Sequence, residues 1–235
     1  MKKLHLGIIP DGNRRYCYKH NMMFNNIIDY WYKNMFLKNI NEIIDSNFEI
    51  LKEFNQVQEL SIYISSIDNI NRNDKTVELG YELIRKLYFV YCNKDKFFSK
   101  RQCEIIKNLN YNFKINIVGE YQLIPDDIKQ ILNSIDKMFN SKAENILIIN
   151  LAIAYDYIKD LLNFGLKNNC NYNREQTQID CIFRSGNEYR TSGFFPCHSL
   201  YSEIIVFDKL WPEINIEDFK NVIYIYNNRH RRFGK

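Results

Sequence analysis

Residues 5–16 read His5-Leu6-Gly7-Ile8-Ile9-Pro10-Asp11-Gly12-Asn13-Arg14-Arg15-Tyr16, an apolar run that stops at a polar turn. The short apolar stretch Leu4–Ile9 predicts a strand, and Asp11-Gly12-Asn13 directly after it predicts a tight turn. Glycine lets the backbone approach a ligand closely, and the two arginines that follow can bind phosphate oxygens through paired N–H groups. An ordinary turn with solvated arginines is the alternative, and on spacing alone it is the more frequent outcome.

Short β-prone runs alternate with longer helical segments along all 235 residues. Because such alternation builds parallel sheets, we predict one α/β domain over residues 1–235, with a mostly parallel central sheet surrounded by helices. Ligands collect at the carboxyl ends of the strands in such folds, so the polar residues after strands are the site candidates. Strands are predicted at Leu4–Ile9, Glu59–Ser65, Phe113–Val118, Asn145–Leu151, Ile179–Phe183 and Ile204–Phe207, and helices at Ile27–Phe54, Val77–Tyr91, Pro125–Met138, Tyr155–Phe164 and Ile216–Asn227.

The composition is that of an ordinary globular protein, with 46% hydrophobic and 26% charged residues. The net charge of +4 is mild and the two signs are interspersed, so we predict no nucleic-acid partner. The first apolar stretch ends at Pro10, too early for a signal peptide, and no run of eighteen apolar residues follows; a cytoplasmic location is therefore expected. The six cysteines lack metal-site spacing and are predicted to be free thiols, and the four histidines are too scattered for a metal site.

Two further polar clusters follow predicted strands. Ser66, Asp68, Asn69 and Arg72 come after the second strand, and the run Arg184-Ser185-Gly186-Asn187-Glu188-Tyr189-Arg190-Thr191-Ser192-Gly193 follows the fifth. We expect Arg15, Arg72, Arg184 and Arg190 to meet at one rim, where they would bind diphosphate, and two such groups rather than one. Each cluster alone also describes a polar loop, and Glu203 alone a surface carboxylate. No D-D-x-x-D pair, G-x-x-x-x-G-K-[ST] or G-x-G-x-x-G motif occurs, which disfavours trans-prenyl synthases and the usual nucleotide sites.

These clusters resemble the motifs of the cis-prenyltransferases, which include undecaprenyl and dehydrodolichyl diphosphate synthases. Residues 5–16 are similar to H-x-x-x-I-M-D-G-N-x-R, residues 66–72 to S-x-E-N-[FW]-x-R, and residues 179–190 to D-L-x-I-R-T-[SG]-G-E-x-R. Tyr201-Ser202-Glu203, Leu210-Trp211-Pro212 and Arg231-Arg232-Phe233-Gly234-Lys235 also match in order and spacing. The resemblance covers nearly the whole chain, and the forms Arg14-Arg15-Tyr16 and Ser66-Ile67 are closer to the dolichol-type members.

The resemblance implies a role for each matching residue. Asp11 would bind Mg²⁺ and assist diphosphate departure, and Asn69 would help proton removal. Glu203 would complete the metal site, and one alternative is that it does so from the neighbourhood of the other subunit. The allylic diphosphate would contact Gly12, Asn13 and Arg15, and isopentenyl diphosphate would contact Arg184, Arg190 and Ser192. The matching positions Arg14, Tyr16, Ser66, Asp68, Arg72 and Thr191 would also bind substrate, and Arg232 and Gly234 would reach across a dimer.

The family resemblance implies that isopentenyl diphosphate is condensed onto an allylic diphosphate such as farnesyl diphosphate, with Mg²⁺, to give a long polyprenyl diphosphate of the dehydrodolichyl type. It further implies a homodimer and an apolar tunnel, whose walls we expect at Ile27–Phe54 and Val77–Tyr91. Two alternatives are a subunit of a two-component enzyme and a non-enzymatic polyanion-binding protein. An accessory subunit, and peripheral contact with the endoplasmic reticulum membrane for product release, are left open.

The sequence departs from the family motifs at several positions. Pro10 replaces Met, Asp68 replaces Glu, Ile70 replaces an aromatic residue, and Asn187 replaces Gly. The family's Gly-His pair has no counterpart at residues 24–34, and Asp156-Tyr157-Ile158 replaces Gly-Gly-Arg. These changes put full activity in question, while the central aspartate, asparagine and arginines are retained.

Overall fold

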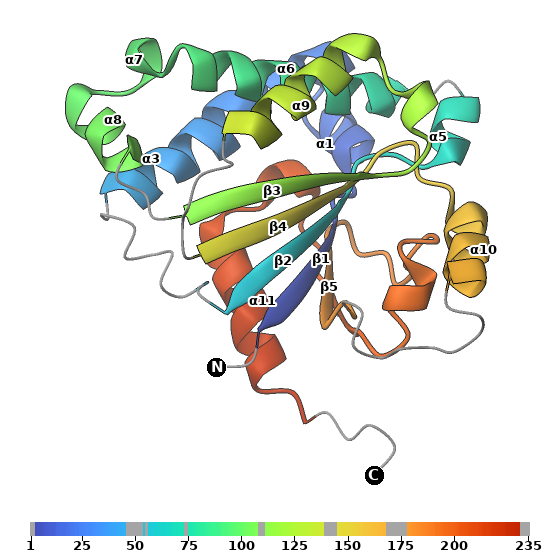
Figure 1. The fold of residues 1–235 in the computed structure, drawn as a ribbon. Coiled ribbons are helices and arrows are strands. Elements are labelled where there is room, and N and C mark those ends of the chain that lie inside the picture. Colours follow the sequence, from blue (N-terminus) through green and yellow to red (C-terminus); the bar gives the residue numbers. More distant parts are fainter. Residues whose placement is uncertain are drawn as a thin grey trace.

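The structure is a computed structural model that describes residues 3–45, 54, 56–72, 75–107, 111–138, 145–167 and 178–230. Its strands form one parallel sheet in the order β3-β4-β2-β1-β5-β6 (Figure 1). The predicted α/β fold with a mostly parallel sheet is confirmed. The strands are β1 Leu4–Ile9, β2 Val57–Tyr63, β3 Tyr111–Val118, β4 Asn145–Ala152, β5 Cys181–Arg184 and β6 Glu203–Val206.

Strand β1 lies in the middle of the sheet, and all six of its residues are buried. It pairs with β2 on one side and with β5 on the other, so the chain changes direction across the sheet at β1. The loops that follow these three strands therefore leave the same edge of the sheet next to one another. This switch point is where open α/β sheets bind ligands, and the three predicted polar clusters all lie there.

One face of the sheet carries most of the hydrophobic core. Leu4, Leu6 and Ile8 of β1 pack against Val222 and Ile223 of α11 (Ile216–Asn227). Farther along the sheet, a second cluster joins β4 to α6 (Lys75–Cys92) and α9 (Asp126–Met138). In Figure 1, α3, α6 and α9 run together along the top of the view, while α10 (Tyr157–Lys167) stands apart from them.

The helices differ from the prediction mainly at residues 13–54. The expected helix Ile27–Phe54 is divided into α2 (Ile27–Tyr30), a π-helical stretch (Trp31–Leu37) and α3 (Lys38–Asp45), and residues 46–53 lie outside the described part of the chain. The predicted single helix was wrong because periodicity alone does not reveal the wider π-helical turn. Four short helices were not predicted: α1 Asn13–Lys19, α5 Ile67–Asn71, α7 Lys94–Phe97 and α8 Lys100–Lys107.

Strand limits were predicted to within about two residues. Strand β2 ends at Tyr63 rather than Ser65, because Ser66 already caps α5, and β5 begins at Cys181 rather than Ile179. Within the described ranges, every helix is too short or too polar to cross a lipid bilayer. Cys17, Cys92, Cys103, Cys181 and Cys197 form no disulfide with one another, and Cys170 lies outside the described residues.

Candidate active site

Asp11 lies in the turn between β1 and α1. Gly12 has φ of 103°, which glycine adopts without strain, and its N–H donates to Asp11 Oδ1 at 2.6 Å. The carbonyl oxygen of Asp11 accepts from the Ser185 hydroxyl at 2.8 Å and from the Trp211 N–H at 2.9 Å. The turn is therefore held by two segments that are distant in sequence.

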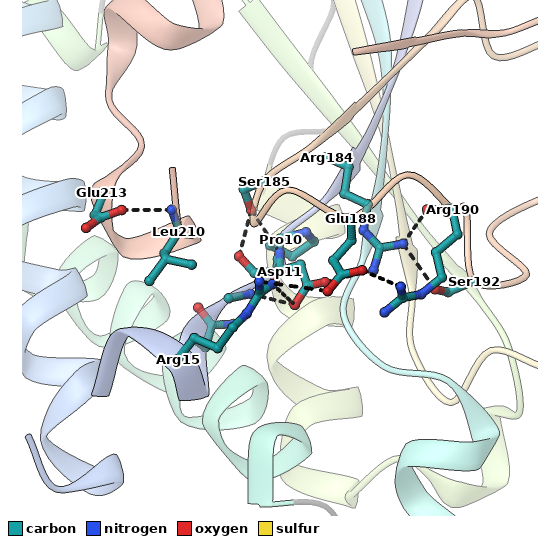
Figure 2. A network of polar contacts seen from close by, with 12 residues as sticks. Pro10, Asp11, Arg15, Arg184, Ser185, Glu188, Arg190, Ser192, Leu210 and Glu213 are labelled. Carbon is teal, nitrogen blue, oxygen red and sulfur yellow. Dashed lines mark hydrogen bonds and ion pairs between the residues drawn. The ribbon is translucent and has the colours of Figure 1, made fainter. Parts of the chain in front are cut away.

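The Arg184 side chain reaches Asp11 from the end of β5, as Figure 2 shows. It is only 4% exposed, and Arg184 Nη2 donates to Asp11 Oδ2 at 2.7 Å. Its Nη1 donates to Ser192 Oγ at 3.0 Å and to the carbonyl oxygen of Arg190. Arg184 Nε is buried without an acceptor in the part of the chain that is described. A buried charged donor thus remains available beside Asp11.

Glu188 connects the arginines around this centre. Its carboxylate pairs with Arg190, and Glu188 Oε1 lies 3.8 Å from Arg15 Nη1 (Figure 2). Arg15 Nη2 is also 3.5 Å from Asp11 Oδ1. Glu188 belongs to the polar run after the fifth predicted strand, but the sequence predicted no role for it. Its position between Arg184 and Arg190 was the available signal.

Gly186 permits the loop after β5 to lie against the turn after β1. A Cβ at this position would be 2.5 Å from Arg15 Nη2 and 3.3 Å from the backbone of Asp11, and φ is 87°. Only glycine fits both the conformation and the close approach. Asp11, Arg15, Arg184 and Arg190 are therefore brought together, as the sequence predicted.

The second cluster is ordered by the capping of α5. Asn69 Oδ1 accepts from the Ser66 N–H at 2.9 Å and from the Ser66 hydroxyl at 2.8 Å, while Ser66 Oγ accepts from the Asn69 N–H. This reciprocal pair fixes the Asn69 side chain at the start of the helix. The Tyr63 hydroxyl donates to the Ser192 carbonyl at 3.1 Å, which joins this cluster to the loop after β5. Asp68 is exposed beside it.

Arg14 and Arg72 lie on a different side of α1 from Arg15. Both line a pocket of about 620 Å³, together with Cys17, Met22 and Phe24. Arg14 and Arg15 are consecutive, so their Cα atoms are about 3.8 Å apart and the two groups of cations are neighbours. The expected single rim of four arginines is thus divided into two adjacent groups.

Tyr16, also expected to bind substrate, packs into the core. It is 4% exposed and its ring lies 5.1 Å from that of Tyr30. Burial, and then the neighbouring Tyr30, raise the pKa of Tyr16 above its usual value, so it stays protonated. Asn13 Nδ2 donates to the Pro10 carbonyl at 3.3 Å, and Asn13 Oδ1 is buried without a partner among the described residues.

Glu203 does not lie with Asp11 in the same chain. It opens β6 and pairs in register with Cys181, the first residue of β5, whereas Asp11 follows the last residue of β1. Because the strands are parallel, the two carboxylates lie toward opposite ends of the strands. Glu203 Oε2 is instead 3.9 Å from Arg229 Nε. Thr191 is half-buried in the loop after β5, and Arg232 and Gly234 lie outside the described residues.

Comparisons with known proteins identify the family of the chain. The family described as "Putative undecaprenyl diphosphate synthase" matches residues 9–234. A tritrans,polycis-undecaprenyl-diphosphate synthase (geranylgeranyl-diphosphate specific) of Picrophilus torridus is 29% identical over 98% of this chain and 89% of its own length. A ditrans,polycis-undecaprenyl-diphosphate synthase ((2E,6E)-farnesyl-diphosphate specific) of Buchnera aphidicola is also 29% identical, over 98% and 90%.

Two solved structures share the fold. Lavandulyl diphosphate synthase from Lavandula x intermedia superimposes with a TM-score of 0.69, at 18% identity and 98% coverage of both chains. A probable undecaprenyl diphosphate synthase from Campylobacter jejuni gives 0.63, at 21% identity and full coverage of both. The family match over nearly the whole chain, on a sheet whose switch point gathers the matching motifs, confirms the resemblance seen in the sequence. The chain belongs to the undecaprenyl diphosphate synthase family and is a cis-prenyltransferase.

Proposed function

We propose that the protein condenses isopentenyl diphosphate onto farnesyl diphosphate and repeats the step to give a long polyprenyl diphosphate of the dehydrodolichyl type. One observation carries the proposal: two groups of cations follow the strands that meet at the switch point. Arg15 and Arg184 contact Asp11, with Arg190 beside them, and Arg14 and Arg72 line the pocket beside α1. A condensation between two diphosphates needs two such anion sites close together.

The group around Arg184 fits the diphosphate of isopentenyl diphosphate. Arg184 is buried and paired with Asp11, yet its Nε lacks an acceptor among the described residues. Leaving a buried charged donor unsatisfied costs about 1–3 kcal/mol, which a bound phosphate oxygen would recover. Arg190, Thr191 and Ser192 belong to the same loop. They would supply the remaining contacts with this diphosphate.

The residues present also fit a magnesium ion. Mg²⁺ takes one or two carboxylates and completes its shell with substrate phosphate oxygens and water. Asp11 supplies a partly exposed carboxylate, and two residues away lies the Asn13 side-chain oxygen, which has no hydrogen-bond partner among the residues that the structure describes. Bound there, Mg²⁺ would stabilise negative charge on the departing diphosphate. Gly12 and Asn13 would contact the same diphosphate.

In the proposed reaction, the bond between C1 of the primer and its diphosphate breaks, and a bond forms between C1 and C4 of isopentenyl diphosphate. A proton then leaves C2 of the isopentenyl unit, and the new double bond is cis because the unit is held in one orientation. Asn69, whose side chain is held by Ser66, is the residue proposed to assist that proton transfer. The arginines would anchor both diphosphates during the reaction.

The active form we propose is a homodimer. Within one chain, Glu203 and Asp11 lie toward opposite ends of the parallel strands. A metal site that uses both residues would therefore take Glu203 from a second subunit. Helix α10 also exposes Ile158, Leu161 and Leu162 by 40–60%, and a second subunit would cover these apolar side chains. Arg232 and Gly234 are proposed to reach the partner's site. The predicted apolar tunnel stays a prediction, as do the cytoplasmic location and the peripheral membrane contact.

The test is incubation of the purified protein with labelled isopentenyl diphosphate, Mg²⁺ and either farnesyl or geranylgeranyl diphosphate. Chromatography of the products gives the primer preference and the chain length. We expect Asp11→Asn to lower turnover at least about a hundredfold, because it removes the carboxylate that holds the metal. Exposed Asp208→Asn is the matched control. An Asp11→Asn protein with full turnover would contradict the metal role.

Two alternatives have distinct outcomes in the same experiment. Product that forms only after a partner protein is added would identify the chain as a subunit of a two-component enzyme. No product under any condition, together with binding to polyanions in general, would favour the non-enzymatic alternative.

A further inference from the structure

The loop after β5 adopts the left-handed backbone conformation at three closely spaced positions. The φ angle is 53° at Ser192, 77° at Gly193 and 42° at Phe195. Glycine adopts this conformation freely, whereas serine and phenylalanine do so rarely. A residue other than glycine keeps such a conformation only where the surrounding contacts hold it in place. The segment therefore depends on the elements packed around it, and it carries the Ser192 hydroxyl of the proposed isopentenyl diphosphate site.

Two polar contacts connect Ser192 to neighbouring strands. The Tyr63 hydroxyl donates to the Ser192 carbonyl oxygen at 3.1 Å. Arg184 Nη1 donates to Ser192 Oγ at 3.0 Å, a contact that is drawn in Figure 2. A shift in the backbone at Ser192 would therefore remove an acceptor from the buried guanidinium of Arg184.

The ring of Tyr157 packs against the next residue of this turn. A Cβ at Gly193 would lie 3.0 Å from Tyr157 Cδ1, 3.2 Å from Cγ and 3.5 Å from Cβ. Tyr157 is the first residue of α10, whose start is capped by Asp156 Oδ1, which accepts from the N–H groups of Ile158 and Lys159. The atoms nearest to Gly193 thus belong to the base of a side chain at a capped helix start. Tyr157 supports the turn from the side of α10.

We propose that Tyr157 is a positioning residue for isopentenyl diphosphate, which holds the Ser192-Gly193 turn and, through it, the Arg184 guanidinium. The inference rests on the proposed function, because it takes isopentenyl diphosphate as the ligand of this loop. The motifs that the sequence resembles have Gly-Gly-Arg where this chain has Asp156-Tyr157-Ile158. The aromatic support is consequently a feature of this chain, and Tyr157 is matched to the absence of a side chain at Gly193.

The first experiment is a double-mutant cycle in the full chain, with Tyr157→Ala, Gly193→Asn and the double variant. Asparagine tolerates the left-handed region, so the cost of Gly193→Asn arises mainly from its Cβ against the ring. Isopentenyl diphosphate is titrated calorimetrically into protein saturated with Mg²⁺ and farnesyl thiodiphosphate, an unreactive primer analogue. We expect Gly193→Asn to raise the dissociation constant about 30-fold when Tyr157 is present and about threefold after Tyr157→Ala.

The cycle isolates the contact between the two residues. Any effect of Tyr157→Ala on subunit assembly is the same with either residue at position 193, so it cancels from the comparison. An equally large effect of Gly193→Asn in both backgrounds would overturn the inference.

Steady-state kinetics separate positioning of one substrate from a general structural role. In Tyr157→Ala, KM for isopentenyl diphosphate should rise about tenfold, while KM for the primer and kcat stay within about twofold. Tyr157→Phe keeps the ring and should restore KM to within about twofold of wild type. Tyr224→Ala, at an exposed position of α11, is the matched control. An equal rise in KM for both substrates overturns the assignment to isopentenyl diphosphate.

Amide hydrogen exchange of the ligand-free protein supplies a readout that needs no product. We expect Tyr157→Ala to exchange about tenfold faster than wild type over residues 185–195, with unchanged exchange in α11. Unchanged exchange over residues 185–195 overturns the inference, even if the wild-type protein makes polyprenyl product. A wild-type protein that makes no product contradicts the proposed function, and the exchange comparison still decides whether Tyr157 holds the loop.

Discussion

Asn187 lies at the tip of the loop after β5, with φ of 57°, in the left-handed region. The related motif has glycine here, and asparagine is the non-glycine residue that adopts this conformation most easily. The backbone N–H of Asn187 donates to the Phe207 carbonyl at 2.8 Å, so the conformation is held in place. The substitution therefore preserves the loop that carries Glu188 and Arg190.

We expect Asn187→Gly to change the free energy of unfolding by no more than about 0.5 kcal/mol, and Asn187→Val to lower it by about 1–2 kcal/mol. The β-branched side chain clashes in the left-handed region, whereas glycine does not. Urea unfolding followed by circular dichroism measures both values. Equal stability of the two variants would show that the loop takes another conformation in solution.

Arg184→Lys tests the importance of the forked guanidinium. A lysine cannot contact Asp11, Ser192 and the Arg190 carbonyl in the same geometry, although it keeps the positive charge. We expect kcat/KM for isopentenyl diphosphate to fall about 10- to 100-fold. Arg101→Lys, at an exposed position of α8, is the control. Retention of full kcat/KM would mean that only the charge matters.

At the scale of elements, the sequence predicted the strands and the final helix well because their hydrophobic patterns are strong. β1 and α11 have the predicted limits. Helix α1 was missed because Gly12, Asn13 and two arginines favour a turn. In the structure, Tyr16 and Cys17 of this helix pack into a cluster that Leu210 and Trp211 also contact. Helix α5 is too short for periodicity to detect, although Ser66 and Asn69 carry its capping signal.

A row of polar side chains crosses the sheet on the face opposite α11. His5 Nε2 lies 2.8 Å from Ser61 Oγ, and Asn150 Nδ2 donates to Ser61 Oγ at 3.1 Å and to Glu59 Oε1 at 2.7 Å. Asn116 continues the row to β3. Burial raises the pKa of Glu59, and the hydrogen bond from Asn150 opposes that shift.

This shift predicts how stability depends on pH. The folded-state pKa of Glu59 lies above the unfolded value of about 4.5, so the folded protein retains a proton that the unfolded chain releases. The contribution of Glu59 to stability therefore decreases as pH rises through the folded pKa. We expect Glu59→Gln to unfold at a higher temperature than wild type at pH 8 and at the same temperature at pH 4.

Exposed Glu104→Gln on α8 should show no such pH-dependent difference and is the control. Thermal melts at both pH values make the comparison. A Glu59→Gln protein that is less stable than wild type at pH 8 would indicate a stabilising charge at this position.

For the whole molecule, the placement of Glu203 is what the sequence could not reveal. Glu203 begins a strand and Asp11 follows one, so a parallel sheet separates the two residues within a chain. The sequence grouped Asp11, Arg15, Arg184 and Arg190 correctly because each follows a strand near the switch point. It did not reveal that Arg14 and Arg72 face a separate pocket, since that depends on the orientation of α1.

The dimer proposal predicts the effect of a charge on α10. Ile158→Asp places a carboxylate in the exposed apolar surface of this helix, and burying it in an interface costs several kcal/mol. Sedimentation velocity should show a dimer for wild type and a monomer for Ile158→Asp, with a parallel loss of turnover. Asn163→Asp, on the same helix, is the control. A monomeric wild type with full activity would contradict the proposal.

The carbonyl oxygen of Asp11 accepts a hydrogen bond from the backbone N–H of Trp211. The Trp211 ring packs edge-on against Phe219 of α11, with 6.3 Å between the ring centroids. A displacement of the turn after β1 therefore alters the surroundings of an indole ring near the end of the chain. Trp211 is one of two tryptophans in the molecule, and it acts as a built-in optical reporter. Its emission senses events at the first turn, about two hundred residues earlier in the sequence, without an attached dye.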